Sequence, residues 1–251
     1  MLILSSLFFV IVGVVFGAIG STVGGSSLVS VPFLISIGLS PVSAIATSKF
    51  AILASFITGG FKYSKDGFLK EKKLAILLSI PALLGSIAGS FLVLRIEQAT
   101  LSKIVTVLLI LVFGLTLIKN DTNTATKKIQ VTKTKKALGI LAMFALGVYS
   151  GFFGAGFGAF AILSLVYLLG YSFLESAALM TVINFFALLT ATVIFIGHGA
   201  INYADGIPLL FGGAIGGWLG AKYAVIKGNV WIRRIFLLIT AGLIINLILK
   251  N

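Results

Sequence analysis

Long apolar stretches alternate with short polar ones along the chain, and this pattern predicts membrane helices throughout. The apolar stretches lie at 2–19, 28–37, 41–61, 74–94, 101–118, 137–153, 159–169, 171–196, 207–225 and 235–249. Because about 20 apolar residues in a helix cross a bilayer, we expect an all-α polytopic membrane protein with about 8–10 membrane segments. The first stretch has neither a basic n-region nor a polar cleavage site, so we interpret it as a membrane helix rather than a signal peptide.

A glycine-rich run from Gly17 to Pro32 interrupts the apolar pattern. Glycine weakens a helix by up to about 1 kcal/mol relative to alanine, and proline removes a backbone donor. Backbone opened at membrane depth is tolerated only where it is buried in protein or lines a cavity. A second run of this kind extends from Gly147 to Gly158. Matching breaks in two halves of a chain are the best sequence indication of a transporter's binding site.

These glycines belong to a wider internal repeat. At a constant offset Gly17, Gly20 and Gly24 align with Gly151, Gly154 and Gly158, and further pairs are Gly38 with Gly170, Gly67 with Gly199, and Gly85-x-x-x-Gly89 with Gly216-x-x-x-Gly220. We interpret the two GxxxG motifs as helix-packing seams. We expect a first membrane repeat at 1–118, a linker at 119–136 and a second membrane repeat at 137–251. The linker is basic and polar, and the alternative for it is a phosphosite or a docking segment.

The distribution of basic residues predicts how the two halves are oriented. Loop 62–73 holds five basic residues and its counterpart at 198–206 holds none, whereas the turn at 95–103 holds two and its counterpart at 222–234 holds four. Cytoplasmic loops of membrane proteins are enriched in Lys and Arg. We therefore expect loops 62–73 and 119–136 to be cytoplasmic and the halves to form inverted repeats. Each half would contain glycine-broken short helices followed by two spanning helices. A plain count of eight spans would instead make the repeats parallel.

Composition excludes several classes of function. The chain is 59% hydrophobic and only 10% charged, whereas soluble domains carry about 25% charged residues. Its net charge of +13 does not indicate nucleic-acid binding, because 11 of the 19 basic residues fall in the two predicted cytoplasmic loops. The sequence contains no cysteine, no HExxH motif, no Cys/His cluster and no Walker loop. We therefore expect neither an enzyme nor a bound metal or cofactor.

The two glycine breaks are candidate anion sites. Small hydroxyl residues and unpaired backbone N–H groups at a helix N-terminus favour negative charge. The alternative is close packing, since membrane helix interfaces also use Gly and Ser. With two breaks in matching places we favour a substrate site formed by Gly20, Ser21, Thr22, Gly24, Gly25 and Ser26 in the first half and by Gly154, Gly156 and Gly158 in the second.

Lys49 is the most informative charge in the sequence. It lies about 12 Å into the apolar stretch that begins at Pro41, at 1.5 Å per residue. An ionisable residue inside a membrane segment indicates a functional site. Together with Thr47 and Ser48 it would present one cation and two hydroxyls to an oxyanion. The alternative is that its side chain snorkels to the interface.

The matching part of the second half offers Thr181 and Asn184, three residues apart on one helix face. These two side chains either line the cavity or form hydrogen bonds between helices. Glu175, near the start of the same helix, is interpreted as either a structural cap or a proton-coupling carboxylate. His198, the only histidine, is a candidate proton relay in a polar turn.

The chain resembles the TauE/SafE sulfite exporter family of anion permeases over nearly its whole length. The resemblance is carried by Gly17, Gly20, Gly24, Gly25, Pro32, Gly38, Pro41, Ala44, Ala46, Thr47 and Ser48, and in the second copy by Gly151, Gly154, Gly156, Gly158, Gly170 and Thr181. It implies a cytoplasmic-membrane permease for sulfur-containing or organic oxyanions. The sequence departs from the usual pattern at Ser26 and Ser27, where a third glycine is common, and at Lys49, which follows the Thr-Ser pair.

We therefore expect a secondary transporter that moves small oxyanions such as sulfite or sulfonates by alternating access. The expected partners are a small anionic substrate and the lipid bilayer, with a homodimer left open. A passive anion channel and a non-transporting membrane scaffold are the alternatives. Dependence of flux on an ion gradient would distinguish the transporter from a channel. Absence of flux in liposomes would indicate the scaffold.

Overall fold

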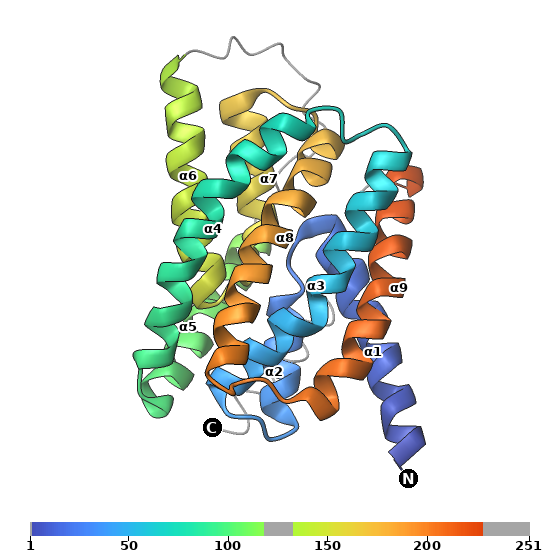
Figure 1. Cartoon of the computed structure of the whole chain (residues 1–251), viewed down its shortest axis with the longest axis vertical. Coiled ribbons are helices and arrows are strands. Elements are labelled where there is room, and N and C mark those ends of the chain that lie inside the picture. The colour runs from blue at the N-terminus through green and yellow to red at the C-terminus, as the bar shows by residue number, and fades with distance from the viewer. Residues whose placement is uncertain (1, 118–132, 228–251) are drawn as a thin grey trace.

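The computed structural model describes residues 2–117 and 133–227, and within these ranges the fold is all-helical (Figure 1). The helices are α1 (Leu2–Val23), α2 (Ser27–Ser36), α3 (Pro41–Lys65), α4 (Lys72–Arg95), α5 (Gln98–Leu117), α6 (Lys133–Phe152), α7 (Phe157–Leu169), α8 (Phe173–Gly197) and α9 (Tyr203–Lys227). The expected segment at 235–249 and most of the linker at 119–136 lie outside the described residues. Residues 133–136 of the predicted linker form the first turn of α6.

Five of these helices are long and apolar enough to cross a membrane. The candidate spans are Pro41–Lys65, Lys72–Arg95, Thr134–Phe152, Phe173–Gly197 and Tyr203–Ile226. Helices α2 and α7 contain 10 and 13 residues. At 1.5 Å per residue they measure about 15 and 20 Å, short of the roughly 30 Å hydrocarbon core. The protein is thus a multi-pass membrane protein in which a short helix precedes two long ones, as the sequence predicted.

The order of helix lengths in α1–α4 recurs in α6–α9, with a short helix in second place each time. In Figure 1, α3 runs from the bottom of the molecule to the top and α8 from the top to the bottom. The packing is also reciprocal, because α1 lies against α9 and α6 lies against α4. An inverted repeat requires this arrangement, but the inverted relation itself stays a prediction.

Local sequence explains where the two central helices begin. Pro41 opens α3, and the Ser40 side chain accepts a hydrogen bond from the Ser43 backbone N–H at 3.3 Å. Helix α8 begins with a capping box, in which Ser172 accepts from the Glu175 N–H and the Glu175 carboxylate accepts from the Ser172 N–H. Such caps satisfy N–H groups that have no partner within the helix.

The two GxxxG motifs are packing seams, as predicted. A Cβ atom added at Gly89 of α4 would lie 2.0 Å from the Val148 carbonyl oxygen of α6, and one added at Gly216 of α9 would lie 2.0 Å from the Val14 oxygen of α1. Only glycine lets two backbones approach this closely. Since lipid is as apolar as the side chains, such close contact supplies much of the attraction between membrane helices.

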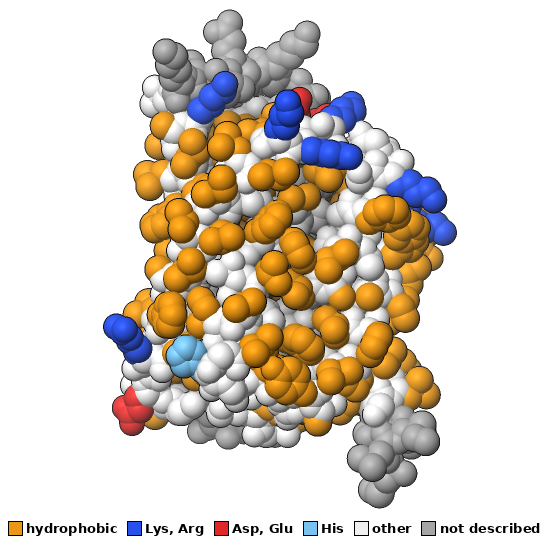
Figure 2. Space-filling view, viewed as in Figure 1, with side chains coloured by type: hydrophobic (Ala, Val, Ile, Leu, Met, Phe, Trp, Pro, Cys, Tyr) orange, Lys and Arg blue, Asp and Glu red, His pale blue; other side chains and the backbone are white. Residues whose placement is uncertain are grey.

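Charged side chains gather at one end of the bundle. In Figure 2 most of the Lys and Arg residues lie at the top, where α3 connects to α4, whereas the histidine lies near the bottom. The flank between the two ends is largely hydrophobic. A hydrophobic flank is expected of a membrane protein, and the orientation of the basic end toward the cytoplasm stays a prediction.

Candidate functional site

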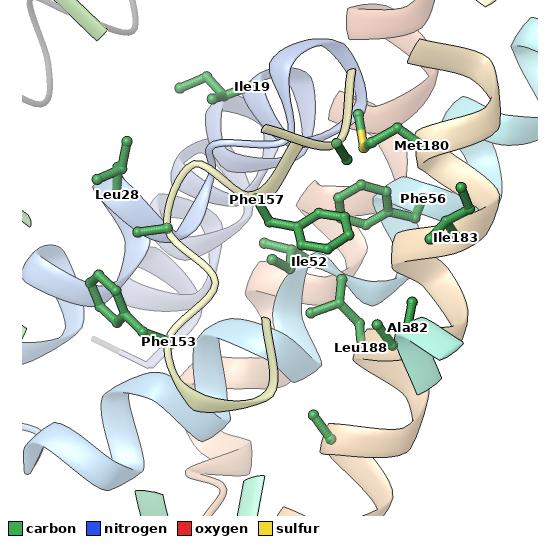
Figure 3. Packing of buried hydrophobic residues seen from close by; sticks show 14 of the residues in the cluster. Ile19, Leu28, Ile52, Phe56, Ala82, Phe153, Phe157, Met180, Ile183 and Leu188 are labelled. Carbon is green, nitrogen blue, oxygen red and sulfur yellow. The ribbon is translucent and has the colours of Figure 1, made fainter. Parts of the chain in front are cut away.

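In the middle of the bundle the first glycine break packs against the start of α7, directly after the second break. The first covers residues 24–26, between α1 and α2, and the second covers residues 153–156, between α6 and α7. The Gly158 N–H donates to the Gly24 carbonyl oxygen at 3.2 Å. A Cβ atom on Gly24 would lie 2.3 Å from the Gly158 Cα atom. The buried side chains near the second break come from α1, α2, α3, α4, α7 and α8 (Figure 3), so the breaks lie in the core rather than at its edge.

The first break is shorter than the sequence predicted, because α1 continues through Gly20, Ser21 and Thr22 to Val23. The Thr22 hydroxyl donates to the Ala18 carbonyl oxygen at 2.8 Å, within the helix. The expectation that Ser21 and Thr22 expose backbone N–H groups is wrong, because both lie inside α1. The glycines of this turn serve close packing instead, since Gly20 lies against the hydroxyl groups of Ser26 and Ser55. Gly24, Gly25 and Ser26 do form the break.

The structure also shifts how the two breaks correspond. Gly24 directly follows α1 with φ +63°, and Gly154 follows α6 with φ +80°. Each of the two glycines lies three residues before the next helix, α2 or α7, so Gly24 corresponds to Gly154, whereas the sequence alignment paired Gly24 with Gly158. Outside the breaks the sequence pairs agree with the backbone, since Gly38, Gly67, Gly170 and Gly199 all have positive φ.

Lys49 crosses from α3 to the second break. Its side chain is 1% exposed, which excludes the alternative in which it snorkels to the interface. The Nζ atom donates to the carbonyl oxygens of Ser150 and, at 3.4 Å, Phe153. Ser150 lies in the last turn of α6 and Phe153 directly follows the helix, at the end where the helix dipole is negative. Among the described residues Lys49 is the only charged side chain in the buried set, and no carboxylate pairs with it.

Two polar pairs, one in each half, lie next to this contact in the sequence and join neighbouring helices. The hydroxyls of Ser48 and Ser30 are hydrogen-bonded to each other, which joins α3 to α2. The Ser150 hydroxyl donates to Asn184 Oδ1 at 3.3 Å, which joins α6 to α8. The structure thus brings Lys49 of the first half to Ser150 of the second, and Asn184 is linked to this contact through the Ser150 hydroxyl.

Other predicted residues point elsewhere. The Thr47 hydroxyl accepts from the Asn202 N–H at 2.9 Å, toward the connection between α8 and α9. Thr181 is buried and its hydroxyl donates to the Ala178 carbonyl at 2.7 Å within α8. A Cβ atom on Gly60 of α3 would lie 3.3 Å from that hydroxyl oxygen. Thr47 and Thr181 therefore contribute to helix packing in this conformation.

The two predicted proton-coupling residues lie at opposite ends of the molecule. Glu175 belongs to the capping box of α8 and lies 3.9 Å from Lys70, which confirms its interpretation as a cap. His198 is exposed at the other end of α8, where Nδ1 is 2.8 Å from the Ile194 carbonyl oxygen. Neither side chain contacts Lys49. Their role in proton coupling stays a prediction.

Sequence reasoning missed three residues of this site. Ser150 offers Lys49 its carbonyl, Ser30 holds Ser48, and the Tyr149 hydroxyl bridges the second break by donating to the Ala155 carbonyl at 2.6 Å. All three lie within the two glycine runs, and this position is the one sequence feature that could have indicated them. Their roles depend on contacts between helices, which cannot be predicted from the runs alone.

Known proteins place the chain in a family. The family model described as "Sulfite exporter TauE/SafE" matches residues 9–247. A probable membrane transporter protein of Haemophilus influenzae is 30% identical over 227 residues, covering 88% of this chain and 86% of that protein. The probable membrane transporter protein YfcA of Escherichia coli is 28% identical over 242 residues, covering 96% of this chain and 87% of that protein. No solved structure matches the chain significantly. With the break pair, the glycine seams and the full-length match, this chain belongs to the TauE/SafE sulfite exporter family of membrane transporters.

Proposed function

We propose that this protein is a secondary transporter that carries small oxyanions, sulfur-containing or organic, and that Lys49 binds the anion. The observation that carries the proposal is the buried ammonium of Lys49, which has no carboxylate partner among the described residues. Burying an unpaired charge costs several kcal/mol, so a buried charge inside a membrane segment indicates a functional site. The family match and the names of the two relatives support transport.

The chemistry around Lys49 favours a particular charge on the substrate. One buried ammonium balances one negative charge, and the described residues bring no second buried cation. Monoanions such as sulfonates or hydrogensulfite therefore fit better than dianions. The Ser48, Ser30 and Ser150 hydroxyls and the Asn184 amide lie on the helices around the lysine and can donate hydrogen bonds to an oxyanion.

A bound anion would take the place of the carbonyls that Lys49 contacts. The ammonium lies on the Ser150 and Phe153 carbonyls, which partly compensate its charge. An incoming anion offers a full negative charge, and the ammonium exchanges the carbonyls for the anion. The exchange releases the second break from α3, so substrate binding is linked to a change between the halves. In an inverted repeat this change rocks one half against the other and alternates access to the site.

Flux of sulfite and of small alkylsulfonates into liposomes containing the purified protein tests this proposal. In Lys49→Met the side chain keeps a similar volume and loses its charge, so the variant should fold at least as well, because apolar replacement of a buried charge is often neutral or stabilising. Flux should fall about 100-fold or more, since losing a buried charged partner costs about 3–5 kcal/mol. Lys103→Met, at an exposed position, is the matched control and should transport normally.

Two outcomes contradict the proposal. Unchanged anion flux in Lys49→Met removes the lysine from the site. A channel instead of a carrier is indicated if the flux does not saturate with substrate concentration, does not depend on an ion gradient and does not respond to anion on the opposite side.

A further inference from the structure

A cluster of two aromatic residues and two lysines lies where α3 meets α9 near the basic end. Phe61 and Lys65 are four residues apart on α3, and Trp218 and Lys222 are four residues apart on α9. Residues at this spacing share one face of a helix. The Phe61 and Trp218 rings stack with centroids 6.1 Å apart. Two neighbouring helices therefore present the same unit, an aromatic ring one turn before a lysine, and we call these four residues the α3–α9 cluster.

The cluster faces outward from the bundle. Phe61 is 64% exposed, and the Lys65 and Lys222 side chains are exposed as well. The Lys65 Nζ atom lies 5.9 Å from the centre of a Trp218 ring, over its face. Aromatic rings concentrate where the bilayer core meets the headgroups, and lysines extend from there toward the polar side. Helix α3 ends at Lys65, at the end of the molecule where most Lys and Arg side chains gather (Figure 2), so in a bilayer we expect the cluster to lie near the lipid headgroups.

The two lysines of the cluster form no ion pair in the described part of the chain. The neighbouring Asp66 already binds Lys62, with both carboxylate oxygens 2.7 Å from its Nζ atom. No carboxylate pairs with Lys65 or Lys222 within residues 2–117 and 133–227. Lys65 also benefits from the C-terminal dipole of α3, but that attraction fades within one turn. Lys222 lies more than one turn before the end of α9, so the dipole does not explain its placement.

We propose that the α3–α9 cluster binds the phosphate headgroup of an anionic phospholipid. The two lysines supply positive charge to the phosphate, and the stacked rings pack against the glycerol and upper acyl chain. The site is separate from Lys49 and does not depend on which substrate the protein carries. Anionic lipids concentrate in the cytoplasmic leaflet and attract basic segments by about 1 kcal/mol per Lys near the surface.

Fluorescence of Trp218 tests this site directly. The chain has two tryptophans, so Trp231→Phe leaves Trp218 as the sole indole reporter. Phosphatidylglycerol brominated high on the acyl chain should quench Trp218 at lower mole fraction than phosphatidylcholine with the same chains. In Lys65→Gln/Lys222→Gln the affinity for phosphatidylglycerol should fall about 30-fold, which corresponds to about 2 kcal/mol at about 1 kcal/mol per lysine.

A second measurement uses the natural sequence and needs no tryptophan substitution. Phosphatidylglycerol added to detergent-solubilised protein should raise the melting temperature, and the double lysine variant should lose most of that rise. Arg95→Gln/Lys103→Gln removes two exposed cations at the opposite end of the bundle and should keep it. Equal quenching by both lipids, an unchanged response in the double lysine variant, or equal stabilisation by inorganic phosphate would overturn the proposal.

Discussion

The two glycine breaks have similar sequences and occupy matching places, but they differ in what reaches them. At the first break the carbonyl oxygen of Gly24 accepts from the Gly158 N–H, and the contact is entirely between backbones. At the second break side chains hold the carbonyls, since Lys49 binds Ser150 and Phe153 and the Tyr149 hydroxyl binds Ala155.

A single position accounts for much of this difference. The sequence offset that aligns Gly38 with Gly170 also aligns Lys49 of α3 with Thr181 of α8. Lysine is long enough to reach the opposite half, whereas the Thr181 hydroxyl bonds within its own helix. A duplicated fold therefore carries an asymmetric site. The first break is a packed backbone contact, and the second is a polar centre with one buried cation.

The largest expected effect comes from breaking the backbone contact itself. Gly24→Ala would force a Cβ atom to within 2.3 Å of the Gly158 Cα atom at a residue with φ +63°. Overpacking costs about 1–3 kcal/mol, and the left-handed conformation adds about 1–2 kcal/mol. Thermal unfolding in detergent should show this loss of several kcal/mol. Gly38→Ala is the matched control, because its φ is +104° but its Cβ atom would meet open space; equal losses in both variants would mean that the contact between the breaks is unimportant.

Moving the cation tests whether the asymmetry is functional. In Lys49→Thr/Thr181→Lys the halves exchange these two residues, and the carbonyls of Ser150 and Phe153 lose their ammonium donor. We expect transport to stay at the level of Lys49→Thr alone, about 100-fold below the natural protein, because the polar groups remain at the second break. Recovery of flux in the exchanged variant would show that the two breaks are equivalent.

A smaller effect is expected where Asn184 supports the polar centre. Asn184→Leu keeps the volume and removes the acceptor of the Ser150 hydroxyl, which is then left buried. The variant also lacks the amide that is proposed to donate to the anion, and because a hydrogen bond to a charged group contributes about 1.5–3 kcal/mol, the half-saturating substrate concentration should rise. Flux measured across a substrate series separates this change in binding from a change in maximal rate. An unaltered concentration dependence would place Asn184 outside the site.

The smallest effect concerns the bridge over the second break. Tyr149→Phe removes the hydrogen bond to the Ala155 carbonyl and should cost about 1 kcal/mol. Amide hydrogen exchange should speed up at residues 153–158 and stay the same at residues 24–29. Thr190→Ala, which removes a hydroxyl bonded within α8 at 2.9 Å, should leave both segments unchanged. Equal acceleration at the two breaks would mean that they open as one unit.

The sequence pattern predicted most of the fold because membrane helices depend on length and apolarity. The ranges 28–37, 41–61 and 74–94 agree with α2, α3 and α4 within a few residues at most ends. The predicted end of α1 at residue 19 is wrong for a physical reason. Glycine weakens an isolated helix, but at Gly20 the missing side chain also lets the helix pack closely against its neighbours, and that contact stabilises it.

The site was predictable only in part. The depth of Lys49 in an apolar stretch predicts its burial, and the glycines predict the break at Gly24 and Gly25. The partners of Lys49 could not be predicted, because Ser150 and Phe153 bind it through backbone carbonyls, which every residue has. Whether a hydroxyl bonds within its helix, as in Thr181, or to another helix, as in Ser48, depends on how far the neighbour lies, and only the packed structure sets that distance.

The reciprocal packing of α1 with α9 and of α6 with α4 also constrains how the chain is made. Each opening helix finds its glycine seam in the other half, so neither half completes its own contacts. Helix α1 leaves the ribosome about 200 residues before α9, which at about 5–20 residues per second is a delay of about 10–40 s. During that time the face of α1 that contains Gly13 and Gly17 has only lipid or a chaperone beside it. The packing of α1 is therefore complete only after α9, the last described helix, has been made.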